Sequence, residues 1–272
     1  MPQIIWTLIA SWRYYRRAQT IYQIHSPLAY QLIELIRAKE QAYYAFTNIA
    51  ALKELALRDK TVINRMDFGT GKKNQSISIR RFAQKAIVKR LRGERYFRLV
   101  QWKKPHTILE LGTALGFSTA YLASAARNAR LHTLEGDPEL VAYAKNLISK
   151  LELRNVDFHQ GKIEDQLDSL TRQIAPIDVV LLDANHQYDA TVAYFESIRP
   201  HLSKQAYIIV DDIRWSAGMY KAWQRMIQAL DRVMAIEFYG WGLLILDAPI
   251  PRSVHLISIP TRWKPWTIRH SI

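Results

Sequence analysis

Apolar and polar positions follow a regular alternation in the later part of this chain. From Thr107 onward, short apolar runs alternate with segments in which apolar residues recur every three or four positions. The runs predict strands and the spaced segments predict helices. Their alternation is typical of the α/β class, with an open, doubly wound, mostly parallel sheet. The predicted strands are 106–112, 130–137, 155–161, 177–184, 205–212 and two more within 233–247.

The last two of these seven strands differ from the others in their connection. Only a short segment with Gly240 and Gly242 separates them, and no helical stretch intervenes. A connection of this length joins antiparallel neighbours. We therefore expect the sheet to close with an antiparallel hairpin.

The first third of the chain lacks this alternation and is predicted to be helical. Ser26 is a candidate N-cap with Pro27 at the first helical position. Residues 78–102 form a second, strongly basic helical stretch, and 66–76 is a loop rich in Gly, Lys, Asn and Ser. We expect three parts: a basic helical region 1–104 that caps the substrate side of the sheet, a sheet domain 105–250, and a tail 251–272.

Charge is distributed unevenly over the 272 residues. Residues 1–106 hold 21 Lys and Arg against 6 Asp and Glu, so the whole excess of the +14 net charge precedes the first predicted strand. Such asymmetry indicates either an acidic partner or a solvated basic surface, and composition alone does not choose between them.

The chain has no cysteine, no recognisable signal peptide and no apolar run of membrane-spanning length, which favours the cytoplasm.

The stretch ILELGTALGFST, residues 108–119, is the strongest candidate for chemistry. Gly112 and Gly116 follow a strand and open a helix, but their spacing matches neither the dinucleotide fingerprint nor a P-loop. Glu110 beside the turn would repel phosphates and suit an ammonium group. Glu135, at the end of the next strand, stands where an acid accepts hydrogen bonds from ribose hydroxyls in related folds. One acid for an amine and one for a ribose describe S-adenosylmethionine.

Four segments in order, ILELGTALGFSTAYLA, LHTLEGDPELVAYAKNL, IDVVLLDANHQY and AYIIVDDI, resemble the motifs of class I S-adenosylmethionine-dependent methyltransferases. The likeness is closest to the small-molecule, catechol O-methyltransferase-like branch and covers about residues 105–250. It implies a Rossmann-like fold, a methyltransferase domain over 105–250, and methylation of a small-molecule hydroxyl. The cofactor-binding residues that it implies are Glu110, Gly112, Thr113, Gly116, Ser118, Glu135, Gly161, Ile163 and Asp183.

The resemblance also implies a reacting end at the carboxyl ends of the fourth and fifth strands. Asp183, Asp211 and Asp212 match positions that hold Mg²⁺ or a similar divalent cation in metal-dependent members. Asp212 stands where asparagine is common, and His186 replaces the usual lysine base. Asp183 and His186 are therefore the expected catalytic pair. Helix capping by Asp211 and Asp212, and a structural loop role for His186, are the competing interpretations.

Two other functions stay open on the sequence alone. The basic first third would suit a methyltransferase acting on RNA or another nucleic acid, although LDANHQY is unlike the motif of enzymes that methylate base amines. A non-catalytic protein would instead use the segment IIWTLIASWRYYRR on a membrane surface or a partner. Salt-dependent RNA binding would favour the first, and failure to bind S-adenosylmethionine the second. The sequence does not determine the oligomeric state.

Overall fold

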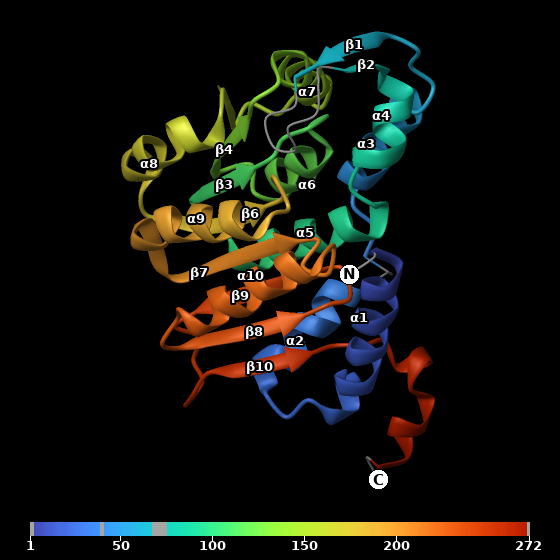
Figure 1. Ribbon diagram of the computed structural model, residues 1–272, viewed down its shortest axis with the longest axis vertical. Helices are drawn as coiled ribbons and strands as arrows, with labels where there is room; N and C mark the ends of the chain where they lie inside the picture. The colour runs from blue at the N-terminus through green and yellow to red at the C-terminus, as the bar shows by residue number, and fades with distance from the viewer. Residues whose placement is uncertain (1–2, 39–40, 67–74, 271–272) are drawn as a thin grey trace. The chain divides into compact units, whose positions relative to one another are not determined.

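The computed structural model describes residues 3–38, 41–66 and 75–270 (Figure 1). Its main sheet has eight strands in the order β10-β8-β9-β7-β6-β3-β4-β5. The chain divides into two compact units. We call residues 38–180 the central unit, and residues 1–37 together with 181–272 the terminal unit. The predicted loop 66–76 lies mostly outside the described residues, because 67–74 are not described.

The sheet of the central unit is parallel, as the apolar runs predicted. Strands β3 (Thr107–Leu111), β4 (Arg130–Glu135) and β5 (Val156–Gln160) pair in parallel, and β6 (Ile177–Leu182) begins in this unit. Helices α6 (Phe117–Ala125), α7 (Pro138–Lys150) and α8 (Ile163–Ile174) connect them. Helix α7 starts where Asp137 caps the backbone N–H groups of Glu139 and Leu140, with Pro138 next. Each parallel strand therefore ends in a turn that leads into a helix.

The segment before β3 contains more than the expected helices. It holds α3 (Tyr44–Ala56), α4 (Ile79–Ala86), α5 (Arg90–Lys103) and a small antiparallel pair, β1 (Val62–Arg65) with β2 (Gln75–Ser78). The basic stretch 78–102 thus forms two helices. Ser78 caps α4 by accepting from the Arg81 backbone N–H, and the extended backbone of Ile87 ends that helix. Apolar residues of α5, among them Tyr96 and Leu99, are fully buried.

The sheet of the terminal unit confirms the predicted antiparallel ending. Strand β9 (Trp241–Leu246) pairs antiparallel with both β7 (Leu202–Asp211) and β8 (Val233–Glu237). An eighth strand, β10 (Val254–Ile257), pairs parallel with β8 and lies in the segment expected to be a tail. Only seven strands were expected, because the segment after 250 was predicted to be a tail. Helices α9 (Tyr188–Ile198) and α10 (Ala217–Gln228) belong to the same unit.

The two ends of the chain meet inside the terminal unit. Helix α1 (Gln3–Arg17) leads to a bridge between Gln19 and Ser258, and α2 (Pro27–Arg37) follows, with Ser26 at its predicted N-cap. Arg37 donates to the Ile259 carbonyl at 3.0 Å and to the Ser258 hydroxyl at 2.8 Å. Four short 3₁₀ helices complete the elements: Ile21–Gln23, Arg199–His201, Thr261–Trp263 and Pro265–His270.

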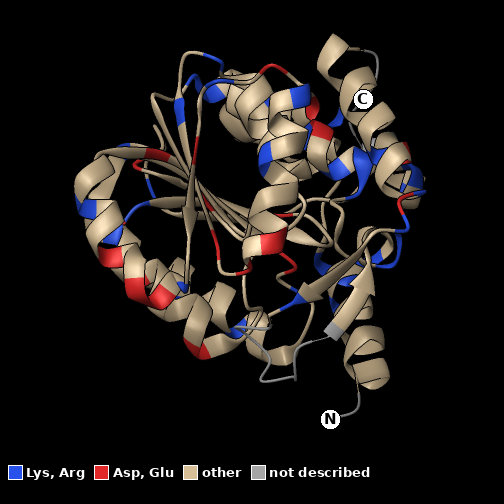
Figure 2. Cartoon of the chain, turned by 90° about the horizontal axis from the view of Figure 1, so that it is seen from above, with Lys and Arg blue, Asp and Glu red and all other residues tan. Residues whose placement is uncertain are grey.

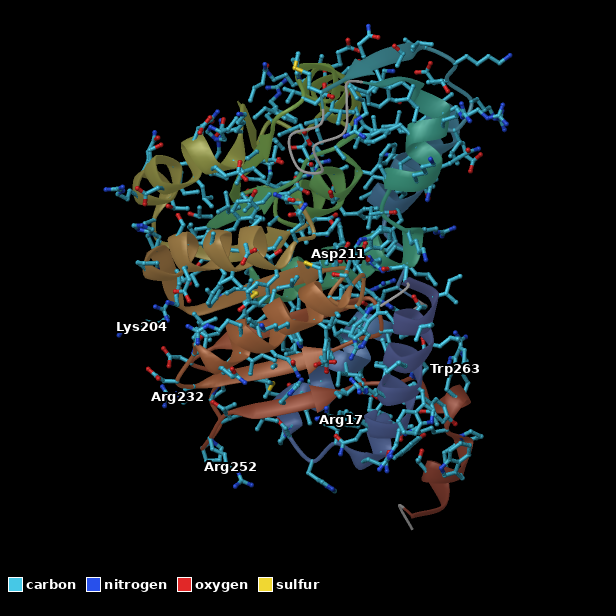
Figure 3. All side chains as sticks on the ribbon, viewed as in Figure 1. Arg17, Lys204, Asp211, Arg232, Arg252 and Trp263 are labelled. Atoms are coloured by element: carbon cyan, nitrogen blue, oxygen red, sulfur yellow. The ribbon has the colours of Figure 1, made fainter. Side chains whose placement is uncertain are left out.

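Helix α1 concentrates positive charge. It carries three arginines, Arg13, Arg16 and Arg17, and no acidic residue. Figure 2 shows the positions of all described Lys and Arg residues in blue, and Figure 3 labels Arg17 on α1 and Trp263 near the C-terminus. Among the residues described, no helix has both the length and the apolar character that a membrane crossing requires.

Candidate active site

The turn between β3 and α6 has the backbone conformation that glycines allow. Gly112 has φ +96° and Gly116 has φ +82°, both in the left-handed region. The Gly112 N–H donates to the Leu134 carbonyl at 3.1 Å, which ties the turn to β4. A Cβ on Gly116 would lie 2.9 Å from the Cβ of Ala144 on α7. Gly116 is therefore required by the close approach of α7 as well as by the turn.

Glu110 is fully buried on β3 beside this turn. Its Oε2 accepts hydrogen bonds from the hydroxyls of Thr119, at 2.5 Å, and Thr133, at 2.7 Å. Burial raises the pKa of Glu110 to about 7, against the opposing effect of the Thr119, Ser118 and Thr133 hydroxyls.

The other Glu110 oxygen suits a cationic ligand group. Among the described residues, Oε1 is buried and has no hydrogen-bond partner. A buried acceptor without a partner costs free energy, which a donor from a ligand would recover. An ammonium group is the ligand donor that would also favour the charged carboxylate. Glu110 therefore fits the amino group of S-adenosylmethionine.

Thr113 and Thr133 support Glu110 from the turn and from β4. Their hydroxyls lie 2.5 Å apart, and both side chains are buried. Thr133 thus bonds both Thr113 and Glu110, so the position of the turn and that of the carboxylate are coupled. Sequence reasoning missed Thr119 and Thr133. Thr133 lies three positions after the start of β4 and directly opposite Glu110, but only the pairing register in the structure shows this.

Glu135 ends β4 and is held by backbone N–H groups. Its Oε2 accepts from Ala114 at 2.9 Å and its Oε1 from Asp137 at 3.1 Å. Burial raises the pKa of Glu135, although these two backbone hydrogen bonds act in the opposite direction. Each carboxylate oxygen can accept a second hydrogen bond. The carboxylate is therefore oriented in advance and still able to accept from two hydroxyls, as ribose binding requires.

The end of β5 provides the residues expected near the adenine. Gly161 has φ +139°, and its N–H donates to the Glu135 carbonyl at 2.9 Å. A Cβ at Gly161 would lie 2.1 Å from Nε2 of Gln166, which donates to the Gln160 carbonyl. Ile163 is half-buried at the first position of α8. The turn after β5 thus adjoins the end of β4, which carries Glu135.

In the terminal unit, Asp183 and His186 follow β6 and lie together. Nε2 of His186 is 3.7 Å from Oδ1 of Asp183, and both side chains are partly exposed. Asn185 and His186 have φ +62° and +42°, an uncommon conformation for two successive residues other than glycine. Strained backbone of this kind often marks a functional loop. The His186 ring centroid is 6.4 Å from that of Trp215, which is exposed.

Asp211 and Asp212 end β7, where Figure 3 labels Asp211. Asp211 is buried, and its Oδ1 accepts from the Asp212 backbone N–H at 2.7 Å. Asp212 has φ +49°, and its carbonyl accepts from Trp215 N–H. These aspartates do not cap α10, because Ser216 accepts from the Met219 N–H there.

The structure does not show the expected metal site among the described residues. Within 3–38, 41–66 and 75–270, no group of three or more His, Cys, Asp or Glu side chains is placed to hold a metal ion. One oxygen of Asp211 accepts from the Asp212 backbone N–H, and Asp212 has left-handed backbone. The divalent cation that the resemblance implies at Asp183, Asp211 and Asp212 therefore stays a prediction.

A family model described as a methyltransferase domain matches residues 109–213. A catechol O-methyltransferase from Niastella koreensis is 40% identical over 90 residues, which cover 32% of this chain and 41% of that protein. This chain thus aligns with less than half the length of that curated relative.

Solved structures are similar over more of the chain. An O-methyltransferase from Bacillus cereus in complex with SAH has a TM-score of 0.55 and 20% identity, covering 79% of this chain and 94% of that one. An O-methyltransferase from Streptomyces achromogenes involved in tomaymycin synthesis, in complex with SAM, has a TM-score of 0.55 and 21% identity, covering 79% and 95%. These likenesses show the fold. With the family match, they show a methyltransferase domain over residues 109–213 whose fold is that of solved O-methyltransferases.

Proposed function

We propose that this protein transfers a methyl group from S-adenosylmethionine to a hydroxyl of a small molecule. The observation that carries the proposal is the buried Glu110 carboxylate, with an oxygen that lacks a partner among the described residues, beside a glycine turn. The catechol O-methyltransferase relative supports a small-molecule hydroxyl as the acceptor. When bound, S-adenosylmethionine supplies a methyl group made electrophilic by its sulfonium.

In the central unit, the acids and the turn would bind and orient the cofactor. Glu110 would pair with the amino group of the cofactor, while Ser118 would help to hold the carboxylate of its methionine moiety. Glu135 would accept hydrogen bonds from the ribose hydroxyls, and Gly161 with Ile163 would border the adenine. The backbone N–H groups that hold Glu135 keep it in one orientation, so little ordering is required when the cofactor binds.

The acceptor chemistry is assigned to Asp183 and His186. His186 Nε2 would take the proton of the acceptor hydroxyl as its oxygen bonds to the methyl carbon and the carbon–sulfur bond breaks, which yields S-adenosylhomocysteine and the methyl ether. The Asp183 carboxylate would stabilise the positive charge that forms on the imidazole. The divalent cation implied by the resemblance stays a prediction, which chelation tests separately.

Calorimetry with S-adenosylhomocysteine tests the cofactor site directly. Glu135→Ala should weaken binding by about 1–3 kcal/mol, because ribose hydroxyls would lose their acceptor in a buried site. Glu164→Ala, which removes an exposed acid from α8 of the same unit, is the charge-matched control and should bind as the wild type does. Absence of binding by the wild type, or equal affinity of Glu135→Ala, would disprove the proposed cofactor site.

A further inference from the structure

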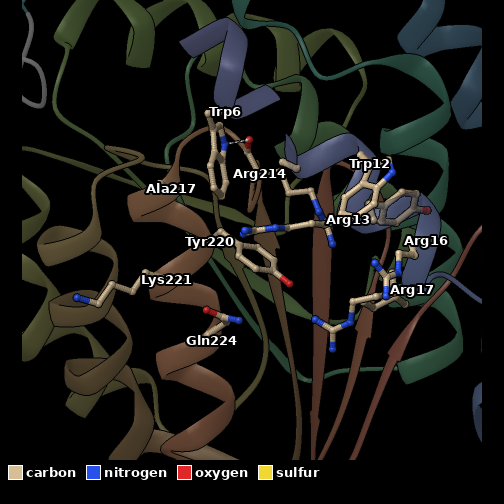
Figure 4. A pocket seen from close by; sticks show the side chains of 13 residues that line it. Trp6, Trp12, Arg13, Arg16, Arg17, Arg214, Ala217, Tyr220, Lys221 and Gln224 are labelled. Atoms are coloured by element: carbon tan, nitrogen blue, oxygen red, sulfur yellow. Dashed lines mark hydrogen bonds between the residues drawn. The ribbon is translucent and has the colours of Figure 1, made fainter. Parts of the chain in front are cut away.

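A cavity of about 500 Å³ in the terminal unit is lined by helices α1 and α10. Trp6, Arg13 and Arg17 line it from α1, and Tyr220 and Gln224 line it from α10 (Figure 4). We call this cavity the α1–α10 pocket. Its volume lies within the range of small-molecule sites, about 300–1,000 Å³. None of its lining residues is acidic.

Arg214 is built into the protein and is not available to a ligand. Its Nη1 donates to the carbonyls of Phe238, at 2.9 Å, and Tyr239, at 3.1 Å, and its Nη2 pairs with Glu237. The guanidinium carbon lies 4.8 Å from the ring centroid of Tyr14 and 5.2 Å from that of Tyr220. The charge of Arg214 is therefore neutralised within a packed wall of the pocket.

Glu237 makes this wall rigid. It is fully buried, and its Oε1 contacts Nε1 of Trp223 at 2.8 Å, Nε2 of His255 at 2.7 Å and the Tyr220 hydroxyl at 3.4 Å. One carboxylate thus connects α10 with strands β8 and β10. Tyr220 is held at its hydroxyl end, so its ring offers a fixed surface to the pocket.

Three further arginines line the pocket from α1: Arg13, Arg16 and Arg17. The guanidinium carbon of Arg16 lies 5.3 Å from the ring centroid of Trp12. Arg13 and Arg17 lie four positions apart, both are exposed, and no carboxylate of a described residue pairs with either. In Figure 4 the Arg17 side chain extends towards the Tyr220 hydroxyl across the pocket. The pKa of Tyr220 is consistent with this arrangement: burial and Glu237 raise it, while Arg214 and Arg17 act in the opposite direction.

Lys221 borders the pocket, but its side chain points towards Tyr188. Its ammonium lies 5.0 Å from the ring centroid of Tyr188, and Figure 4 shows the side chain directed away from Arg13 and Arg17. Apart from Arg16 over Trp12, the guanidinium groups of Arg13 and Arg17 and the Gln224 amide are thus the groups that line the cavity and can donate to a ligand. Paired guanidinium groups recognise planar or tetrahedral oxyanions through parallel hydrogen bonds.

We propose that the α1–α10 pocket binds a small molecule through its oxyanion group, a carboxylate or a phosphate. Arg13 and Arg17 hold the oxyanion, and the Gln224 amide donates a further hydrogen bond. A flat, apolar body of the ligand packs against the rings of Trp6 and Tyr220. This proposal concerns binding alone and does not rest on methyl transfer.

The test uses the full chain and three ring compounds of similar size: benzoate, phenyl phosphate and neutral benzamide. Isothermal titration should show that at least one anion binds about tenfold or more tightly than benzamide, because benzamide offers the guanidinium groups no charge. Comparison of benzoate with phenyl phosphate identifies the preferred oxyanion. Inorganic phosphate, which lacks the ring, should bind more weakly than phenyl phosphate.

Variants separate the paired arginines from general attraction by a basic surface. Arg17→Gln and Arg13→Gln should each weaken anion binding about fivefold or more and leave benzamide binding unchanged. Lys221→Gln removes the same charge at the pocket border and should change anion affinity less than about twofold. Arg17→Lys keeps the charge but loses the planar guanidinium group, so it should bind the anion more tightly than Arg17→Gln and more weakly than the wild type. Equal binding of benzamide and both anions, or an equal effect of Lys221→Gln and Arg17→Gln, would overturn the proposal.

Discussion

Thr133 on β4 donates a hydrogen bond of 2.7 Å to Glu110, its register partner on β3. The carboxylate is thus held by neutral hydroxyls and by no cation among the described residues, although it is fully buried. Burial accordingly raises the pKa of Glu110 to about 7. A carboxyl group with this environment favours the protonated form in the folded protein, and two predictions follow from its titration.

Glu110→Gln should stabilise the protein without cofactor above neutral pH. The folded-state pKa exceeds the unfolded value of 4.5, so wild-type stability falls as pH rises from about 5 to 7. The neutral variant avoids this loss, and its advantage should reach at most about 3 kcal/mol near pH 8 and vanish near pH 4. Urea unfolding at several pH values measures the difference. A difference that is independent of pH would show that Glu110 is not the titrating group.

Cofactor affinity should depend on the same titration in the opposite direction. A ligand ammonium pairs with the ionised carboxylate, so S-adenosylhomocysteine should bind more tightly as pH rises through about 7. Glu110→Gln should bind more weakly at pH 8 and should lose this rise. Calorimetry at pH 6 and pH 8 compares the two proteins. Retention of the rise by Glu110→Gln would assign it to another group.

Gly116→Ala should destabilise the central unit. The added Cβ would lie 2.9 Å from the Cβ of Ala144, and residue 116 would keep a φ of +82° that alanine disfavours. We expect a loss of about 1–3 kcal/mol. Gly218→Ala on α10 is the matched control, because its Cβ would have no neighbour closer than 3.6 Å. Thermal unfolding should show the first variant destabilised and the second unchanged or slightly stabilised.

Asp183 and His186 should affect turnover far more than cofactor affinity. His186→Ala should lower the rate most near neutral pH and less at higher pH, where the acceptor hydroxyl ionises without help. Asp183→Asn should lower turnover far more than it weakens S-adenosylhomocysteine binding. Steady-state rates with and without a chelator complete the measurement. Loss of turnover with chelator and its recovery with Mg²⁺ would show a metal requirement that the described arrangement does not explain.

The strongly periodic segments could be predicted from the sequence, and the reason is burial. Strands such as β6 are apolar nearly throughout because both faces are covered, and Pro27 marks the first residue of α2. The β1–β2 pair could not be predicted, since VINR and QSIS are short and largely polar. Its position depends on distant acids: Asn64 and Met66 donate backbone hydrogen bonds to Glu139 and Asp137.

The residues of the candidate site could be predicted where they lie at the ends of parallel strands. Glu110 and Glu135 could be placed because each stands at a defined point of a parallel strand. The hydroxyls of Thr119 and Thr133 could not, because threonine is common in strands and helices and only the three-dimensional register brings them to one carboxylate. The turn around Asp212 could not be predicted either, because the sequence does not reveal that its backbone is left-handed.

The bridge between Gln19 and Ser258 has a consequence for biosynthesis. Residues 38–180 are contiguous, so the central unit can fold as soon as it leaves the ribosome. Helix α1 is synthesised earlier, but its partner Ser258 follows only after an interval on the order of ten seconds or more, at a synthesis rate of about 5–20 residues per second. During this interval its apolar and basic side chains are exposed to chaperones, nascent chains and lipid, and the terminal unit can form only after synthesis has passed residue 258.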